Sequence, residues 1–409
     1  MAQNNRSTWS IRLAILGSGE RFPFLVRGAH SLPDEVITEF ALTRLRAKGR
    51  AVNTTVSYLH SIAAGLDHLQ RKGINLEERI ASGTFLSIQE LRAFASTCKR
   101  GKRKLTVHPD EAAGRYSRFV EYVVWRAMSH VGRASSELAF EKARSAVRKF
   151  KARTDAVAPK ADKAIQSPDK TLGLNPSQRL LLLAVIEPSD ERNLSADPAL
   201  RARNYAMVRL AYELGPRAGD VLTVKIRDLN LTQRPAAVTF HRRHDDPEDS
   251  RKRQPVLKTK PRVLFISDEL ALALEGWIDS FRSDRDRFPR ARRHPFVFVN
   301  SNGDPLGQRG YQLIYQKLRE KFPELKGLVS HSLRHDWNER WTEMESTGEG
   351  AAKGDLREQC YAMGWSDRSA MPARYSRRAV ADAANRKIIQ MNKRAQERGE
   401  HAVARGDKK

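Results

Sequence analysis

The sequence predicts a mainly α-helical protein of two units, the second being an α+β unit of helices around one small antiparallel sheet. Apolar residues recur at spacings of three and four through residues 31–151 and again beyond residue 173, which is the period of helices that bury one face. Between residues 238 and 266 the pattern changes to short apolar runs that are typical of strands. A polar, Pro- and Lys-rich stretch at 152–172 separates the units and predicts a linker.

The first unit is expected to be a helical bundle behind a short arm. Residues 1–30 show no clear period and predict an arm with little structure of its own. Five helices are expected: from Asp34, from a cap at Asn53 to the stop at Gly73, from Ser87, from Tyr116 to about Val131, and from Ser135 to about Phe150. The start at Ser87 is followed by Glu90 at the spacing of a capping box.

In the second unit, residues 173–409, Pro176 and Pro198 suit first helical positions, and Asp197 can cap the second of these helices. Strands are expected at Val238–Phe240, Val256–Leu257 and Val263–Ile266. Helices then resume at Asp268–Phe281, Gly310–Lys321, Leu333–Met344, Leu356–Met363 and Val380 to about Glu397. Between the strands, residues 241–254 (HRRHDDPEDSRKRQ) predict a long, charged, solvated hairpin insertion.

The charge of the chain points to a polyanionic partner. The 409 residues include 74 Lys+Arg and 48 Asp+Glu, a net charge of +26, and nucleic acid is the default partner for such a surplus. One run supplies five cations in six residues: Lys99, Arg100, Lys102, Arg103 and Lys104. These are our candidate DNA-binding residues, and the alternative is a solvated loop that touches nothing.

Several classes of protein are excluded. No apolar run approaches the ~18 residues of a membrane span, and the short apolar patch near the start is flanked by charges, unlike a signal peptide. Two cysteines, Cys98 and Cys360, cannot form a disulfide framework or a four-cysteine zinc site, so we expect reduced thiols in a cytoplasmic protein. Walker and G-x-G-x-x-G motifs are absent from the sequence, and no cofactor is expected.

Metal binding has two weak candidates, both in the insertion. Four carboxylates there could hold Mg²⁺ as in a nuclease: Asp245, Asp246, Glu248 and Asp249. They lie in a strongly hydrophilic segment, which favours a solvated loop instead. His241 and His244 stand among arginines, which repel a cation, and no Cys or carboxylate lies at zinc spacing from them. No metal site is therefore expected.

Four stretches carry side chains suited to one reaction: LGPRAGDVLTVKIRDL (214–229), VLKTKPRVLFIS (256–267), HSLRHDW (331–337) and MGWSDRSAMPARYSRRA (363–379). Arg217 follows a Gly-Pro pair and is presented from a turn. His331 and Arg334 are three positions apart and so share one helical face. Lys258 enters a tight turn, and Tyr375 lies among arginines in a cationic field.

These groups are together the ones needed to attack a phosphodiester without a metal. Two arginine forks can clamp the non-bridging oxygens and neutralise the charge that develops on them. A lysine can protonate the leaving oxygen. A tyrosine hydroxyl, with an ordinary pKa of about 10, is a poor nucleophile unless cations or a base assist it. When assisted, it can hold the phosphate covalently and conserve the bond energy for a later rejoining.

This ordered set resembles the tyrosine recombinase (phage integrase) family, whose pattern runs Arg, Lys, His-x-x-Arg, His or Trp, and Tyr. The resemblance implies six catalytic residues: Arg217, Lys258, His331, Arg334, Trp365 and Tyr375. Asp220 matches an acidic residue that supports the first arginine, and His335 completes the H-x-L-R-H box. Lys260 is an alternative to Lys258, because KTKPR is one turn residue shorter than the family's K-T-G-K-x-R. Trp365 stands where most members have His.

The resemblance also implies an architecture and a function. Residues 31–151 would be a helical core-binding (SAM-like) domain that clamps DNA opposite a catalytic domain in 173–409, which ends in a C-terminal helix. The protein would be a site-specific recombinase of a mobile element that forms a 3′-phosphotyrosine on double-stranded DNA. It would need neither ATP nor metal, and would act as a homotetramer on two DNA sites in the cytoplasm, at the nucleoid. A type IB topoisomerase and a non-catalytic DNA-binding regulator are the alternatives.

Overall fold

The computed structural model describes residues 8–28, 32–101, 106–160, 173–347, 356–372, 387–389 and 391. Contacts divide the chain into two compact units, residues 1–166 and 167–409, each with its own hydrophobic core. This division lies inside the predicted linker, although a helix of the first unit continues to Val157. The mainly helical fold with small antiparallel sheets is confirmed. The roles assigned to the two domains stay predictions.

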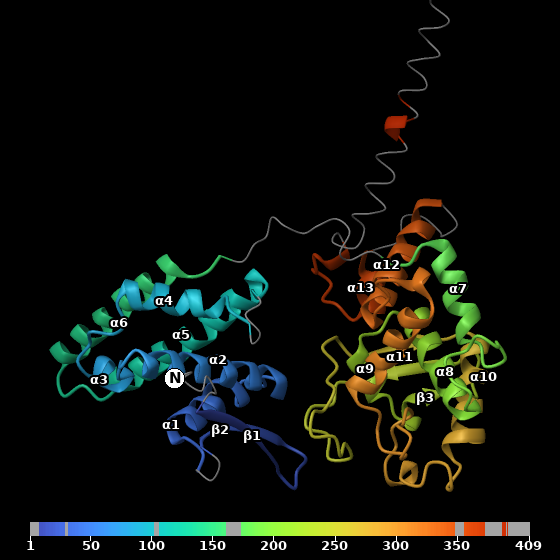
Figure 1. Cartoon of the computed structure of the whole chain (residues 1–409), viewed down its shortest axis with the longest axis horizontal. Coiled ribbons are helices and arrows are strands. Elements are labelled where there is room, and N and C mark those ends of the chain that lie inside the picture. Colours follow the sequence, from blue (N-terminus) through green and yellow to red (C-terminus); the bar gives the residue numbers. More distant parts are fainter. Residues whose placement is uncertain are drawn as a thin grey trace, which may run out of the picture. The chain divides into compact units, whose positions relative to one another are not determined.

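The described part of the first unit consists of a β-hairpin followed by helices (Figure 1). The strands are β1 (Trp9–Ile15) and β2 (Arg21–Arg27), and the helices are α1 (Glu35–Phe40), the π-helical η1 (Ala41–Arg46), α2 (Val52–Arg71), α3 (Leu76–Ala81), α4 (Ile88–Cys98), α5 (Pro109–Val131) and α6 (Glu137–Val157). Aromatic side chains fill much of the core, with the Phe94 and Phe119 rings 4.8 Å apart.

Capping side chains explain where several of these helices begin. Asp34 accepts a hydrogen bond from the Ile37 amide at the start of α1, and Ser87 with Glu90 forms the predicted capping box of α4. Two starts differ from the prediction. Helix α2 begins one residue before Asn53 without a side-chain cap, and α5 begins at Pro109, well before Tyr116. Helix α3, capped by Asn75, was not predicted because it is only six residues long.

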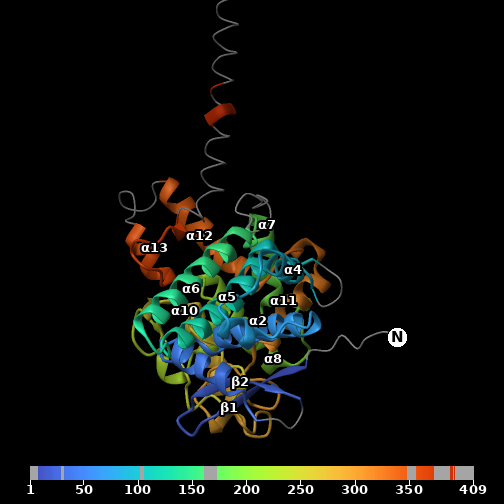
Figure 2. The ribbon, with the colours of Figure 1, turned by 90° about the vertical axis from the view of Figure 1, so that its left-hand side faces the viewer.

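The prediction of an N-terminal arm without structure of its own is wrong for the described residues. Strands β1 and β2 pair in antiparallel register from Trp9 opposite Arg27 to Ile15 opposite Arg21. The hairpin packs on α2 (Figure 2), and Leu25 is only 1% exposed. Each strand is only seven residues long, so its apolar alternation is too brief to stand out as a period. The hairpin is stabilised mainly by the helices beneath it, because an isolated two-stranded hairpin is marginal in water.

In the second unit, helices surround one three-stranded sheet (Figure 1). Its helical elements are α7 (Pro176–Ile186), α8 (Pro198–Leu214), α9 (Ala218–Thr223), η3 (Ile226–Asp228), α10 (Asp268–Gly276), η4 (Trp277–Arg282), η5 (Ala291–Arg293), α11 (Gln308–Lys321), η6 (Pro323–Leu325), α12 (Ser330–Thr347) and α13 (Leu356–Met363). The strands are β3 (Leu229–Asn230), β4 (Ala237–Phe240) and β5 (Arg262–Phe265).

The sheet is antiparallel in the order β3-β4-β5, and it places β5 at an edge. Strands β4 and β5, which overlap two of the predicted strands, pair with Val238 opposite Leu264. The predicted strand at Val256–Leu257 does not form, although Leu257 is buried in the core. The predicted final helix, Val380 to about Glu397, lies largely outside the described residues. Within the described part of the chain, no helix has the length and apolar character needed to cross a membrane.

The insertion at 241–254 is a loop with more than half of its residues exposed, as its composition predicts, but Asp246, Asp249 and Gln254 are buried. Lys225, which is 0% exposed, lies with its Nζ 2.5 Å from carboxylate oxygens of both Asp246 and Glu248. Asp249 is 2% exposed and receives two hydrogen bonds from the guanidinium of Arg251. These ion pairs hold part of the charged segment against the rest of the second unit. Their partners are distant in sequence, so composition alone does not reveal them.

Candidate active site

Arg217 projects from the tight turn between α8 and α9. Gly215 ends α8 in the left-handed conformation, with φ 56°, and a Cβ atom there would lie 2.9 Å from Trp337. The chain therefore needs glycine at this position, both for its backbone angle and for its space. Arg217 then begins α9 as its N-cap residue. Its Nη1 is buried and has no hydrogen-bond partner among the described residues, which leaves a cationic donor available to an anion.

Asp220 fixes the Arg217 turn through its buried carboxylate. Its carboxylate is 0% exposed, and Oδ2 accepts from the Arg217 amide at 3.2 Å and from Thr259 Oγ1 at 3.3 Å. Arg262 donates to the same oxygen at 3.3 Å. The acidic residue expected to support Arg217 thus also binds the hairpin that carries the candidate lysines.

The two candidate lysines differ in their surroundings. Lys260 Nζ lies 3.1 Å from Asp367 Oδ1, and its backbone amide donates to the Gly364 carbonyl at 2.8 Å. Lys258 is exposed and makes no ion pair with any residue that the structure describes. Thr259 between them is 4% exposed and faces Asp220. Both lysines are exposed, and the choice between them as the catalytic lysine stays a prediction.

Helix α12 carries the His-x-x-Arg pair. Arg334 is 0% exposed, and its Nη1 and Nη2 donate to the backbone carbonyls of Gly215 and Met363, each at 2.9 Å. It therefore joins the Arg217 turn to the end of α13. His331 is exposed and its ring lies 4.6 Å from that of His335, measured between centroids.

Trp365 lies just beyond α13 and packs against the same arginine. It is 6% exposed, and its ring centroid lies 5.2 Å from the Arg334 guanidinium carbon, within cation–π range. Cys360, Met363 and Trp337 complete the small apolar cluster around it. Burial of this indole beside the guanidinium is consistent with a packing role, and it cannot act as an acid or base at neutral pH.

The predicted nucleophile Tyr375 lies outside the described residues, and so do Lys102, Arg103 and Lys104 of the predicted DNA-binding run. Lys99 and Arg100 of that run are exposed at the end of α4. Tyr361, two residues before the stretch that contains Tyr375, has its hydroxyl 3.2 Å from the Val263 carbonyl and 3.4 Å from the Val263 amide.

The structure brings Arg217, Asp220, the lysine hairpin, Arg334 and Trp365 to one region around the end of α13. Sequence reasoning missed Arg262, whose guanidinium contacts both the hairpin and Asp220. The K-x-R spacing after Lys260 was its signal, but composition gives no reason to expect an arginine to be buried. Burial lowers the pKa of Arg262, while the neighbouring carboxylate of Asp220 raises it and the charge of Arg217 lowers it further.

Three of the four carboxylates of the insertion are paired with basic side chains. Lys225, Arg227 and Arg251 form ion pairs with Asp246, Glu248 and Asp249. Hydrogen bonds from Lys225 and Arg227 hold the pKa of Glu248 below its ordinary value. Across the part of the chain that the structure describes, no group of three His, Cys, Asp or Glu side chains is placed to hold a metal ion.

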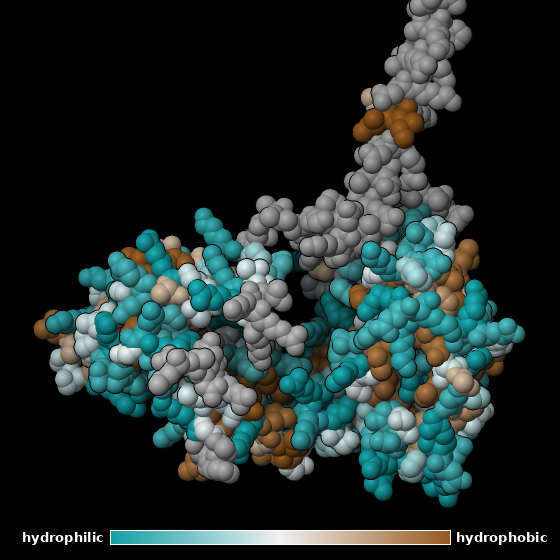
Figure 3. Space-filling view, viewed as in Figure 1, coloured by the Kyte–Doolittle hydropathy of each residue, from teal (hydrophilic) through white to brown (hydrophobic). Residues whose placement is uncertain are grey.

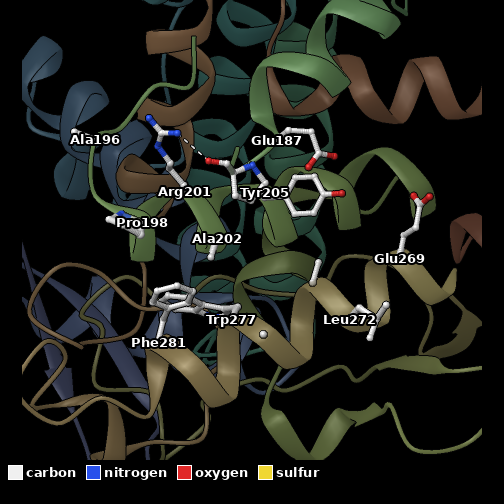
Figure 4. A pocket seen from close by; sticks show the side chains of 13 residues that line it. Glu187, Ala196, Pro198, Arg201, Ala202, Tyr205, Glu269, Leu272, Trp277 and Phe281 are labelled. Atoms are coloured by element: carbon white, nitrogen blue, oxygen red, sulfur yellow. Dashed lines mark hydrogen bonds between the residues drawn. The ribbon is translucent and has the colours of Figure 1, made fainter. Parts of the chain in front are cut away.

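A separate pocket of about 660 Å³ lies in the same unit, between α8, α10 and the loop before α8 (Figure 4). Its polar groups are engaged internally: Arg201 donates to carbonyls of that loop, and burial together with a hydrogen bond to Glu187 raises the pKa of Tyr205 to about 12. The remaining surface is apolar, with Trp277 buried and Leu272 61% exposed. None of the five candidate catalytic residues that the structure describes lines this pocket.

Comparison with known proteins assigns part of the second unit to a family. Residues 182–381 match the sequence model described as "Phage integrase family", a range that contains all six candidate catalytic residues. This part of the chain, just under half of its length, is a phage integrase family domain.

Similar proteins include several bacterial recombinases. A tyrosine recombinase XerC of Roseiflexus sp. (strain RS-1) is 28% identical over 181 residues, 44% of this chain and 48% of the relative. XerC of Actinobacillus pleuropneumoniae serotype 7 is 27% identical over 202 residues, 49% of this chain and 53% of the relative. A XerD of Halalkalibacterium halodurans is 25% identical over 135 residues, 33% of this chain and 39% of the relative. The chain thus spans about half the length of these relatives or less.

Solved structures with similarity to this chain include XerH recombinase bound to palindromic difH substrate, with 15% identity and a TM-score of 0.48 over 83% of this chain and 81% of that one. The Tn1549 transposon integrase in complex with circular intermediate DNA gives 15% identity and a TM-score of 0.44 over 83% of this chain and 94% of that one.

Proposed function

We propose that this protein is a site-specific DNA recombinase that cleaves and rejoins strands through a covalent 3′-phosphotyrosine. Double-stranded DNA is its substrate, in keeping with the net charge of +26. It acts in the cytoplasm, on the DNA of the nucleoid. This activity rests on the phage integrase family domain and on the residues gathered around the end of α13.

In the cleavage step, the Tyr375 hydroxyl oxygen attacks the phosphorus and the bond from phosphorus to the 5′ oxygen breaks. The phenolic proton leaves toward His331, and the Lys258 ammonium group gives a proton to the departing 5′ oxygen. Arg217 and Arg334 stabilise the charge on the non-bridging oxygens. Attack by the free 5′-hydroxyl of a partner strand reverses each transfer and releases Tyr375.

The observation that most supports this function is the buried donor of Arg217. A guanidinium nitrogen that is buried without a hydrogen-bond partner in the described structure is costly. A phosphate oxygen bound there would satisfy it through a charge-assisted hydrogen bond. The exposed Lys258 lies on the hairpin that Asp220 ties to the same turn, so both cations can serve one phosphate.

The test is trapping of the covalent intermediate. DNA flanking the gene is searched for inverted repeats, and a duplex carrying such a repeat is nicked so that a short 5′-hydroxyl fragment diffuses away after cleavage. The wild-type protein is expected to appear as a protein–DNA adduct on a denaturing gel. Complete absence of an adduct on every flanking repeat would contradict the proposed function.

Cleavage is expected to proceed unchanged in excess EDTA, because Arg217, Lys258 and Arg334 supply the charge that a metal would otherwise supply. Adduct formation is measured with EDTA and with added Mg²⁺. As a control, Asp246→Asn and Glu248→Gln, which alter the carboxylates paired with Lys225, are tested under the same two conditions. The chemistry would instead be assigned to the insertion if the wild type cleaved DNA only with Mg²⁺ and these variants did not cleave it at all.

For recombination between two duplexes, we propose a homotetramer built by head-to-tail contacts. Ile388, Ile389 and Met391 are 52%, 68% and 67% exposed, and they form an apolar group in the C-terminal segment (Figure 3). The apolar pocket beside Leu272 offers a complementary surface on another copy (Figure 4). A contact between two different surfaces generates a closed ring when its rotation closes, which suits an assembly of four protomers.

Ile389→Glu and Leu272→Glu are each expected to leave one protomer folded and bound to a single site, while abolishing tetramers on DNA. Both side chains are more than half exposed, so a charge there costs little folding free energy but opposes apolar burial in the contact. Light scattering of protein–DNA complexes measures the assembly. Leu138→Glu, at a position 81% exposed in the first unit, is the matched control. Tetramers that persist in both pocket and tail variants would contradict this contact.

A further inference from the structure

Arg262 is a buried arginine that contacts three segments of the candidate site. It is 4% exposed. Its Nε donates to the Ala362 carbonyl at 2.7 Å, Nη1 to Thr259 Oγ1 at 3.0 Å, and Nη2 to Asp220 Oδ2 at 3.3 Å. Its guanidinium carbon also lies 4.6 Å from the centre of the Phe240 ring. One planar fork therefore fixes three chain segments at defined angles, which a lysine cannot do.

Each of these partners is adjacent to a candidate catalytic residue. Asp220 holds the turn of Arg217, and Thr259 directly follows Lys258. Ala362 lies in the last turn of α13, three residues before Trp365 in the sequence. Arg262 itself is in the first position of β5, whose pairing with β4 holds it in the sheet.

The end of α13 explains why Arg262 binds there. Three successive carbonyls, those of Ala362–Gly364, accept hydrogen bonds from Arg262, from Arg334 and from the Lys260 amide, at 2.7, 2.9 and 2.8 Å. We call these residues the carbonyl turn. The last carbonyls of a helix lack partners within the helix, so donors from the other site segments satisfy them. Gly364 has φ 64°, and a Cβ atom there would lie 2.7 Å from Thr259.

We propose that Arg262 is a positioning residue for the general acid, holding the Lys258 hairpin against the carbonyl turn and the Arg217 turn. This inference rests on the proposed function. All three guanidinium nitrogens of Arg262 donate to Ala362, Thr259 and Asp220, so we do not assign it to DNA contact; it acts through Thr259, the neighbour of Lys258. Without its fork, the hairpin loses its link to the carbonyl turn and to Asp220, and Lys258 no longer meets the 5′ oxygen that it protonates.

The experiment separates protonation of the leaving group from the rest of cleavage. Two nicked duplexes are compared, one with the ordinary 5′ oxygen and one with sulfur at that bridging position. A thiol has a pKa near 8.5, so a thiolate can leave without a general acid, which an alkoxide cannot do readily. Adduct formation is timed on both duplexes, and DNA affinity and thermal unfolding are measured in parallel.

Arg262→Lys keeps the charge but removes the planar fork. On the oxygen duplex it is expected to form adducts about 10²-fold more slowly, the lower end for loss of general acid catalysis. On the sulfur duplex its rate is expected to return to near that of the wild type, as for Lys258→Ala. Arg217→Ala is expected to be slow on both duplexes. Thr259→Val removes one partner of the fork and is expected to show the same pattern with a smaller loss.

Arg282→Lys is the matched control. Arg282 is 6% exposed and donates to the backbone carbonyls of Phe296, Ala291 and His294, so its replacement has a comparable folding cost but touches no site segment. It is expected to lower the thermal unfolding temperature without a selective loss on the oxygen duplex. Equal losses of Arg262→Lys on the two duplexes, or a wild-type rate on the oxygen duplex, would overturn the inference. A wild type without adducts on either duplex would overturn the proposed function itself.

Discussion

Tyr375→Phe is expected to bind the target duplex as tightly as the wild type and to form no covalent adduct with it. The substitution removes one hydroxyl oxygen and leaves the ring, so the charged surface that supplies DNA affinity is unchanged. The covalent step cannot occur without that oxygen, so the loss is expected to be complete rather than partial. A band-shift assay measures binding, and a denaturing gel with the nicked duplex measures the adduct.

Tyr361→Phe is the control for this experiment. Its hydroxyl is already engaged, donating to the Val263 carbonyl at 3.2 Å and accepting from the Val263 amide at 3.4 Å on the edge of the sheet. Removing it is expected to loosen the packing of α13 on β5 slightly while adducts still form. If the adduct survives in Tyr375→Phe and disappears in Tyr361→Phe, the nucleophile is Tyr361 and the family alignment is misplaced.

The parts of the fold that the sequence predicted well are those with local signals. Ser87 with Glu90, and Asp197 before Pro198, fix helix starts through hydrogen bonds between residues close in sequence. These contacts form in any fold that contains the helix, so the sequence alone predicts them. Helix α13, at Leu356–Met363, has the same bounds as predicted.

The parts that escaped prediction depend on partners distant in sequence. The hairpin β1–β2 is stabilised by its contact with α2. The charged insertion is stabilised by Lys225, which lies outside it in the sequence and pairs with Asp246. A charged residue looks solvent-exposed in a sequence unless its buried counter-ion is known. The residues of the candidate site follow from the order of a family pattern. The pattern also includes Arg262 but gives it no role, because its contacts to Ala362, Thr259 and Asp220 come from three separate segments.

The two arginines proposed to clamp the phosphate are expected to fail in different ways when removed. Arg217 is half-buried, and its Nη1 makes no hydrogen bond to a described residue. The substitution Arg217→Ala therefore breaks no hydrogen bond of that nitrogen. Its thermal unfolding is therefore expected to match the wild type, while adduct formation falls by about 10²-fold or more, the usual effect of losing a donor to transition-state charge. Affinity for DNA is expected to change little, because the remaining basic surface supplies it.

Arg334→Ala is expected to lose cleavage and stability together, because this arginine is 0% exposed and binds the carbonyls of Gly215 and Met363. Each buried carbonyl left without its donor costs about 1–3 kcal/mol, and 1 kcal/mol lowers the unfolding temperature of a domain of this size by about 2–4 °C. Arg334→Lys restores the charge but not two parallel bonds, so partial recovery of stability without recovery of rate is expected. Thermal unfolding and adduct formation, measured on the same preparations, test this difference. An Arg334→Ala protein as stable as Arg217→Ala would show that the link between the Arg217 turn and the carbonyl turn is not structural.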